Sequence, residues 1–96
     1  MPLSFEWDEK KAKSNANKHG VTFDEASTVF GDALSLTIPD PAHSEVEKRF
    51  VTMGRSHLGK LIVVVHTERG DNIRIISARS ANRQERKVYE ETKRKK

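Results

Sequence analysis

The spacing of apolar residues predicts five β-strands in this chain of 96 residues. In four stretches apolar and polar side chains alternate over most of their length, which is typical of a strand with one buried face. The fifth stretch, Leu61–Val65, is apolar at every position and therefore indicates a central strand that is buried on both faces. The predicted strands cover residues 3–7, 34–38, 49–55, 61–65 and 73–76.

Capping signals predict three helices between these strands. Asp8 is a suitable N-cap for the first helix, and Gly20 suits the left-handed position after its end. Thr22 and Glu25 have the spacing of a capping box at the start of the second helix. Ser80 is expected to cap the third helix. The predicted helices cover residues 9–18, 23–30 and 81–92.

Together these elements predict an α+β domain with the order β-α-α-β-β-β-β-α. The later strands are joined by short turns, so we expect an antiparallel sheet with the helices mostly on one face. Residues 39–47 are polar and predict a loop, and residues 93–96 form a basic tail that we expect to fray. Because no repeat or linker interrupts the pattern, residues 1–96 are expected to form one domain.

Charge and composition narrow the class of protein. Lysine and arginine total 18 against 14 acidic residues, and the resulting net charge of +4 favours nucleic acid or an acidic protein as partner. The chain has no cysteine, which excludes disulfides, thiolate metal sites and cysteine nucleophiles. We recognise no signal peptide, and the longest apolar run is too short to span a bilayer. We therefore expect a soluble cytoplasmic protein.

Arginines gather where the last predicted strand passes into the last predicted helix: Arg74, Arg79, Arg83 and Arg86. Buried arginines need partners, so several of these must face water, a carboxylate or a phosphate. The guanidinium fork binds two phosphate oxygens at once and stays charged. This strand-to-helix junction is the first candidate for a functional surface. The alternative is that Arg79, Arg83 and also Arg55, near the end of another predicted strand, pair with Glu85, Glu90 or a partner protein.

A set of spaced residues runs through nearly the whole chain, from Phe5 to Glu91. In the first half it comprises Phe5-Glu-Trp-Asp8, Lys10, Asn17-Lys-His-Gly-Val21, Phe23, Ala26 and Val29-Phe30. In the second half it comprises Arg49-Phe50, Gly54-Arg55, Val63–Thr67, Arg69, Ile73-Arg-Ile-Ile-Ser-Ala-Arg79, Glu85, Arg86 and Tyr89. This set resembles the BrnT-type toxins of bacterial type II toxin–antitoxin pairs.

The resemblance implies a RelE-like fold and metal-independent endoribonuclease activity that blocks translation, with no cofactor. It also implies neutralisation by a BrnA-type antitoxin and a pairing of toxin copies within the complex. In such a reaction the ribose 2′-hydroxyl attacks the adjacent phosphate. The reaction requires a base, an acid for the departing 5′-oxygen, and cations around the phosphate.

Arginine side chains are the natural candidates for the cationic role. Arg79 and Arg83, on either side of the strand-to-helix junction, are expected to bind the reacting phosphate, and Arg55 is the third candidate. Further contacts with RNA are expected from Lys18, His66, Arg74 and Arg86.

Candidates for the acid and base are His19, His66 and Tyr89, because histidine exchanges protons near neutral pH and a tyrosine hydroxyl can donate one. Each has a structural alternative. His66 follows an apolar run and could be a strand residue without a catalytic role, and Tyr89 could simply pack beside Val88. His19 ends a helix, where a cationic ring is stabilised by the helix dipole. His43 and His57 are expected to be loop residues at the surface.

Two other classes of function fit the sequence. A non-catalytic nucleic-acid-binding domain and a protein-interaction module that docks an acidic partner both fit the basic charge. A metal site is not expected, since no two histidines have the short spacing of metal ligands. Trp7 could stack on a base, although its position after Phe5 and Leu3 is more typical of a core residue.

Overall fold

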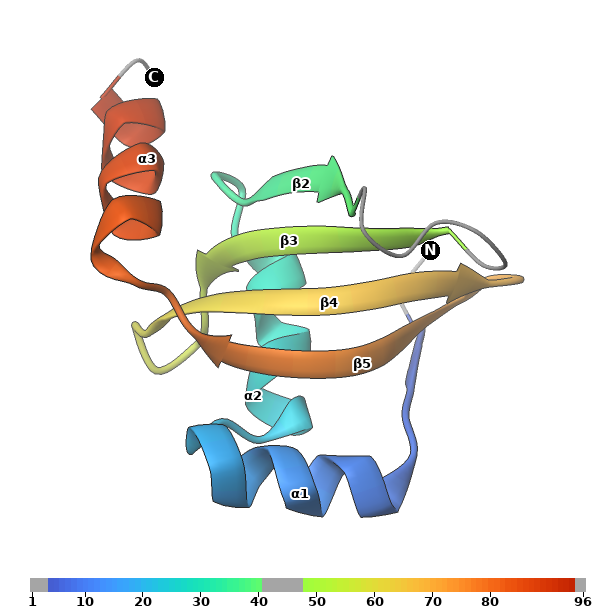
Figure 1. Ribbon diagram of the computed structural model, residues 1–96. Helices are drawn as coiled ribbons and strands as arrows, with labels where there is room; N and C mark the ends of the chain where they lie inside the picture. The colour runs from blue at the N-terminus through green and yellow to red at the C-terminus, as the bar shows by residue number, and fades with distance from the viewer. Residues whose placement is uncertain (1–3, 41–47, 95–96) are drawn as a thin grey trace.

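A computed structural model describes residues 4–40 and 48–94, which form a five-stranded sheet with three α-helices (Figure 1). The predicted α+β class is confirmed. Leu3, the loop residues 41–47 with His43, and the last two residues of the basic tail lie outside the described residues. The elements are β1 (Ser4–Glu6), α1 (Glu9–His19), α2 (Phe23–Thr28), the 3-10 turn η1 (Val29–Gly31), β2 (Leu36–Pro39), β3 (Arg49–Arg55), β4 (Leu61–Arg69), β5 (Asn72–Ser80) and α3 (Arg83–Arg94).

The sheet is mixed, which corrects the expectation of an antiparallel sheet. Its strand order is β1-β5-β4-β3-β2, and the last four strands form antiparallel pairs. β1 instead runs parallel to β5, with Phe5 opposite Ile73. This pairing joins two ends of the chain, so local alternation and turn residues carry no signal for it. Two parallel neighbours need a long crossover connection, and here most of the chain separates them.

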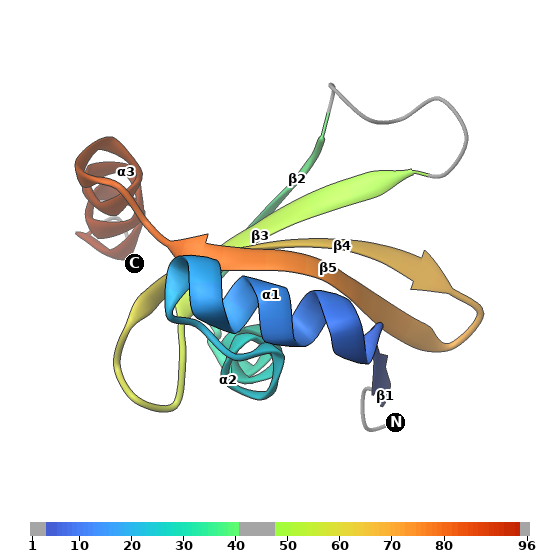
Figure 2. The same cartoon turned by 60° about the horizontal axis from the view of Figure 1, so that its bottom comes forward.

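Two layers of apolar side chains cover opposite faces of the sheet. α1 and α2 lie on one face (Figure 2), and α2 supplies part of the main core. Along β4, Ile62 and Val64 point into that core, whereas Leu61 and Val63 point to the other face, where they meet Tyr89 of α3. α3 thus packs at the end of β5, away from α1. None of the described helices is long and apolar enough to cross a membrane.

The capping residues predicted for the first two helices are confirmed. The Asp8 carboxylate accepts a 2.8 Å hydrogen bond from the backbone N–H of Lys10, and Gly20 follows α1 with φ 71°. The Thr22 hydroxyl accepts from the N–H of Glu25 at 3.0 Å. The Glu25 carboxylate does not complete a capping box, because it accepts a 2.7 Å hydrogen bond from the Ser56 hydroxyl instead.

α3 begins later than predicted, and its N-cap is Asn82, not Ser80. β5 continues through Ser80, and the N–H of Ala81 still donates to the carbonyl of Leu61. Asn82 Oδ1 accepts from the N–H of Glu85, while Glu85 Oε1 accepts from the N–H of Asn82, both at 2.8 Å. This reciprocal pair is a capping box.

Replacing Asn82 by alanine should therefore lower the free energy of unfolding by about 1 kcal/mol, because the cap of α3 is lost. Ser80→Ala is the matched control, since the Ser80 side chain caps nothing, and its effect should stay within about 0.5 kcal/mol. Urea denaturation of both variants measures the difference. Equal losses would contradict the assignment of Asn82 as the cap.

Candidate functional site

Arg79 lies next to the end of β5 and holds the first turn of α3. Its two terminal nitrogens donate hydrogen bonds to the two carboxylate oxygens of Glu85, each 2.8 Å long. These bonds raise the pKa of Arg79 and lower the pKa of Glu85. The side chain of Arg79 nevertheless remains 44% exposed, so a further anion can reach it from solvent.

Arg55, at the end of β3, contacts α3 at Glu90, whereas Arg79 contacts it at Glu85. It donates to the Glu90 carboxylate at 2.9 Å and to the carbonyl of Gly59 at 3.0 Å. Its guanidinium carbon lies 5.4 Å from the centre of the Tyr89 ring, in a cation–π contact. The alternative that the arginines pair with Glu85 and Glu90 is thus realised for Arg79 and Arg55.

Tyr89 is a core residue whose hydroxyl donates to the Asp32 carboxylate at 2.7 Å. It is 2% exposed, and burial together with this hydrogen bond raises its pKa to about 12. Burial alone would raise the pKa of Asp32, but hydrogen bonds from the N–H groups of Arg55 and Leu34 and from Tyr89 hold it below its usual value. The hydroxyl proton of Tyr89 is therefore directed at Asp32, and the side chain packs in the core.

His66 is also a core residue, which corrects the prediction that it contacts RNA. It is 4% exposed and lies between the rings of Phe30 and Phe50, 4.8 and 5.9 Å from their centres. Its Nε2 shares a 2.7 Å hydrogen bond with the Thr52 hydroxyl, and its Nδ1 has no hydrogen-bond partner among the described residues. Burial lowers the pKa of His66 to about 4, so the ring is neutral at pH 7.

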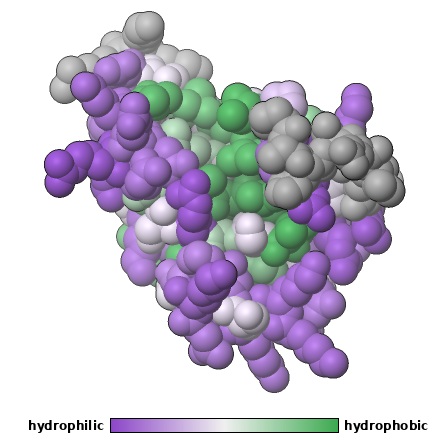
Figure 3. Space-filling model, viewed as in Figure 1, coloured by the Kyte–Doolittle hydropathy of each residue, from purple (hydrophilic) through white to green (hydrophobic). Residues whose placement is uncertain are grey.

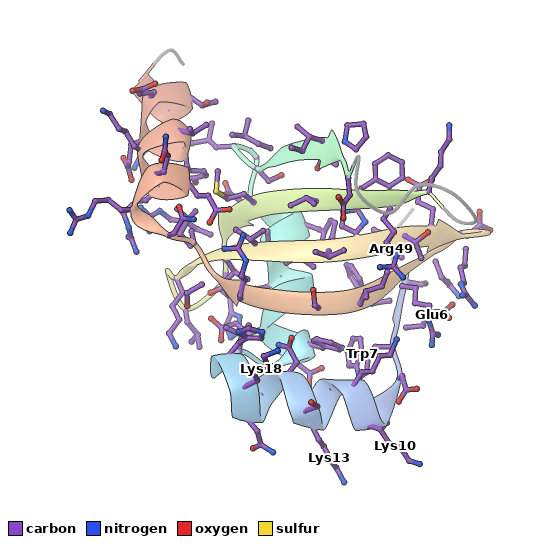
Figure 4. The ribbon with its side chains drawn as sticks, viewed as in Figure 1. Glu6, Trp7, Lys10, Lys13, Lys18 and Arg49 are labelled. Atoms are coloured by element: carbon purple, nitrogen blue, oxygen red, sulfur yellow. The ribbon has the colours of Figure 1, made fainter. Side chains whose placement is uncertain are left out.

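Lys18 and His19 are brought to the end of β5 by a buried asparagine. Asn15, in the middle of α1, donates to the carbonyl of Ala78 at 2.8 Å and accepts from its N–H at 3.1 Å. Lys18 and His19 follow three and four residues later on the same face of the helix, and both are exposed. Figure 4 shows Lys18 at the C-terminal end of α1, on the side of β5.

Arg83 and Arg86 occupy the exposed side of α3, one turn apart. Neither guanidinium forms a hydrogen bond or ion pair with any residue in the part of the chain that the structure describes. The end of α1, the end of β5 and the start of α3 lie at the same end of the sheet in both views, although α1 and α3 cover opposite faces (Figures 1 and 2). The structure thus gathers a cationic end of the sheet, which consists of Lys18, His19, Arg79, Arg83 and Arg86.

Arg74 does not belong to this group. It lies near the start of β5, five residues before Arg79, which is roughly 16 Å along a strand. There it donates to the Glu6 carboxylate at 2.8 Å, and hydrogen bonds from Arg74 and Asn72 lower the pKa of Glu6. Arg74 therefore ties the parallel edge strand β1 to β5.

Asp32 and Asn15 were not predicted as site residues, and both support the site from its buried side. Asp32 holds both Tyr89 and the backbone of Arg55, and Asn15 holds α1 against β5. A polar residue on the narrow apolar face of α1, between Ala12 and Ala16, was an available signal for Asn15. Nothing in the local sequence distinguishes Asp32. Among the described residues, no three histidine, aspartate or glutamate side chains are placed to hold a metal ion.

Comparison with known proteins identifies the family and supports the fold. The model of the family described as "Ribonuclease toxin, BrnT, of type II toxin-antitoxin system" matches residues 7–85. The 1.1 Å crystal structure of the Brucella abortus ribonuclease toxin BrnT is similar to this chain with a TM-score of 0.66 and 24% sequence identity. The similarity covers 85% of this chain and 100% of that one, and at this identity it speaks for the fold alone. A comparison with curated proteins finds no match. Because the family match extends over far more than half of the sequence, the chain belongs to the BrnT family of ribonuclease toxins of type II toxin–antitoxin systems.

Proposed function

We propose that the cationic end of the sheet is an RNA-cleaving site that works without a metal ion, through attack of a ribose 2′-hydroxyl on the adjacent phosphate. The observation that carries the proposal is the convergence of exposed cations from three elements, α1, β5 and α3. The nearby carboxylates are already engaged, since Glu85 and Glu90 bind arginines and Asp32 binds Tyr89. The free charge at this end is therefore positive, as a polyanionic substrate requires.

Arg79 and Arg83 are proposed to bind the reacting phosphate. Glu85 fixes the direction of the Arg79 fork, and the exposed part of that side chain is open to a second anion. Arg83 projects from the first turn of α3, where it is free to approach the same anion. As negative charge grows on the phosphate in the transition state, these two cations stabilise it more than the ground state. Lys18 and Arg86 are proposed to bind neighbouring phosphates.

Arg55 and Tyr89 are proposed to act through other groups. Because Arg55 is held by Glu90, Gly59 and the Tyr89 ring, it positions α3 and with it Arg83. Tyr89 in turn is anchored to the sheet through Asp32. Both are positioning residues, in place of the direct catalytic roles expected from the sequence.

His19 is proposed to transfer protons in the reaction. His66 and Tyr89 are buried, whereas His19 is exposed beside Lys18 at the end of α1, and this exposure favours His19 for the role. Histidine is the side chain best suited to exchange a proton near neutral pH. Lys18 supports it by stabilising negative charge on the phosphate.

Replacing His19 by alanine should lower the rate of RNA cleavage by about 10²–10⁴-fold, the usual contribution of a general acid or base. The fold should not suffer, because the side chain is exposed and makes no hydrogen bond with a described residue. His57→Ala is the matched control, since His57 is an exposed histidine whose ring contacts Thr28. A His19→Ala variant that cleaves RNA at the wild-type rate would remove His19 from the mechanism.

The biological setting that we propose follows the family. The chain would act in the cytoplasm, block translation by cutting RNA, adopt a RelE-like fold, and be neutralised by a BrnA-type antitoxin, with two toxin copies in the complex. Expression of the chain alone in a bacterium tests the toxic activity. Growth arrest that disappears in an Arg79→Ala, Arg83→Ala double variant supports the proposal. Growth arrest that both substitutions leave unchanged would overturn the site.

A non-catalytic RNA-binding domain is the second candidate. Its support is that Arg55 and Arg79 are both ion-paired and that two of the three predicted proton-transfer groups are buried. This alternative predicts that the chain binds RNA with an affinity that falls steeply with salt and yields no product.

A further inference from the structure

The open face of the sheet, opposite α1 and α2, carries an apolar groove that the RNA site does not use. The groove has a volume of about 230 Å³ and lies between β2 and α3 across β3 and β4. Apolar side chains gather on this face of the molecule (Figure 3). Its aliphatic lining consists of Leu36, Ile38, Val51, Met53, Val63 and Val88.

Both walls of the groove expose large apolar side chains to water. Ile38, on β2, is 60% exposed, and Val88, on α3, is 48% exposed. Among the described residues, the remaining exposed large apolar side chain is Leu58, which lies outside the groove on the turn between β3 and β4. Two such residues facing one hollow form a larger apolar patch than a scattered surface residue does, and patches of this kind mark interaction sites.

The chemistry of the lining favours a protein segment over nucleic acid. Single-stranded RNA is held on apolar surfaces by stacking of its bases on aromatic rings. Among the described residues, the lining of this groove contains branched aliphatic side chains, one methionine and one glutamate, and no aromatic ring. Such grooves accept the apolar face of an amphipathic helix.

The charges around the groove indicate which charge the polar residues of the bound helix should carry. Glu85, the acidic residue of the lining, is already paired with Arg79. Strand alternation places Arg49 on the same face as Val51 and Met53, and Arg49 forms no hydrogen bond or ion pair with another described side chain (Figure 4). Arg49 is thus an unpaired positive charge next to Val51 on this face, and the chain as a whole carries a net charge of +4, so a helix with acidic flanks complements it.

We propose that this groove binds the apolar face of an acidic amphipathic helix from a partner protein. The apolar anchors of that helix would lie between Ile38 and Val88, with its acidic residues toward Arg49. The proposal does not depend on RNA cleavage, because the test below measures binding alone.

The experiment uses the full chain and a fluorescent helical peptide of about 18 residues, long enough to form a helix. Its leucines have the spacing i, i+3, i+4 and i+7, and glutamates flank them. A matched peptide carries lysines in place of the glutamates. Fluorescence anisotropy measures the affinity of the wild-type chain and of Ile38→Asp, Val88→Asp and Leu58→Asp, and circular dichroism checks that each variant is folded.

The acidic peptide should bind the wild type and Leu58→Asp equally, and Ile38→Asp and Val88→Asp should each weaken binding at least about tenfold. The lysine peptide should bind at least about tenfold more weakly than the acidic peptide. Absence of binding by the acidic peptide, or equal binding by Ile38→Asp, Val88→Asp and the wild type, would overturn the proposal. A wild-type dimer that Ile38→Asp dissociates would also overturn the proposal, because a second copy of the chain would then occupy the groove. Displacement of the acidic peptide by oligouridine would overturn it as well, because RNA would then be the occupant.

Discussion

Replacement of Arg79 by alanine is expected to lower the rate of RNA cleavage by about 10²–10³-fold, the usual effect of removing one donor that stabilises charge in a transition state. Stability should change far less. The ion pair with Glu85 is half exposed, and such pairs contribute less than about 1 kcal/mol. Single-turnover cleavage of a labelled RNA, with urea denaturation of the same sample, separates the two effects.

Two companion variants sharpen this prediction. Arg79→Lys keeps the positive charge but loses the two-pronged fork, so it should restore only part of the activity. Glu85→Gln removes the carboxylate that competes with phosphate for Arg79, while glutamine can still complete the capping box of α3. Its affinity for RNA should equal or exceed that of the wild type. Full activity in Arg79→Ala would show that Arg79 is a structural residue that only anchors Glu85.

The second large effect is a loss of stability in mild acid that originates at His66. The pKa of His66 is about 4 in the folded protein and near 6.5 in the unfolded chain. The unfolded state therefore binds the extra proton between these values, and the free energy of unfolding falls as the pH is lowered from about 6.5 to about 4. The total loss from this group is about 3 kcal/mol and is complete below pH 4.

Urea denaturation at several pH values between 7 and 4 measures this loss. His66→Gln keeps a polar group near Thr52 but cannot gain a proton. The free energy of unfolding of this variant should be lower than that of the wild type at pH 7, and it should not fall further through this group between about pH 6.5 and about pH 4. His57→Ala, which removes an exposed histidine, should retain the fall. An unchanged pH dependence in His66→Gln would place the acid-sensitive group elsewhere.

Most of the fold could be predicted from local sequence patterns, because strand alternation and helix capping depend on residues that are close together in the chain. Alternation located β3, and the apolar run of Leu61–Val65 located the central part of β4. The caps at Asp8 and Thr22 form within a few residues and are visible in the sequence for that reason. The parallel pairing of β1 with β5 was missed, since it depends on packing between the two ends of the chain.

The candidate site was predicted less completely, because burial decides the role of a polar residue. The sequence places Arg79 and Arg83 at the strand-to-helix junction, and the structure adds that Arg79 is held by Glu85. His66 and Tyr89 have side chains suited to catalysis, but the pairing of strands and the docking of α3 bury them. Asp32, which anchors Tyr89, becomes visible only in three dimensions.

The most direct test is incubation of the purified chain with RNA in EDTA, beside the Arg79→Ala, Arg83→Ala double variant. We expect the wild type to cleave RNA under these conditions and to leave a 2′,3′-cyclic phosphate at the cut, the product of 2′-hydroxyl attack. The double variant should be folded and inactive. Folded wild-type protein that binds RNA without cutting it in EDTA, or a double variant that cuts as fast as the wild type, would contradict the account.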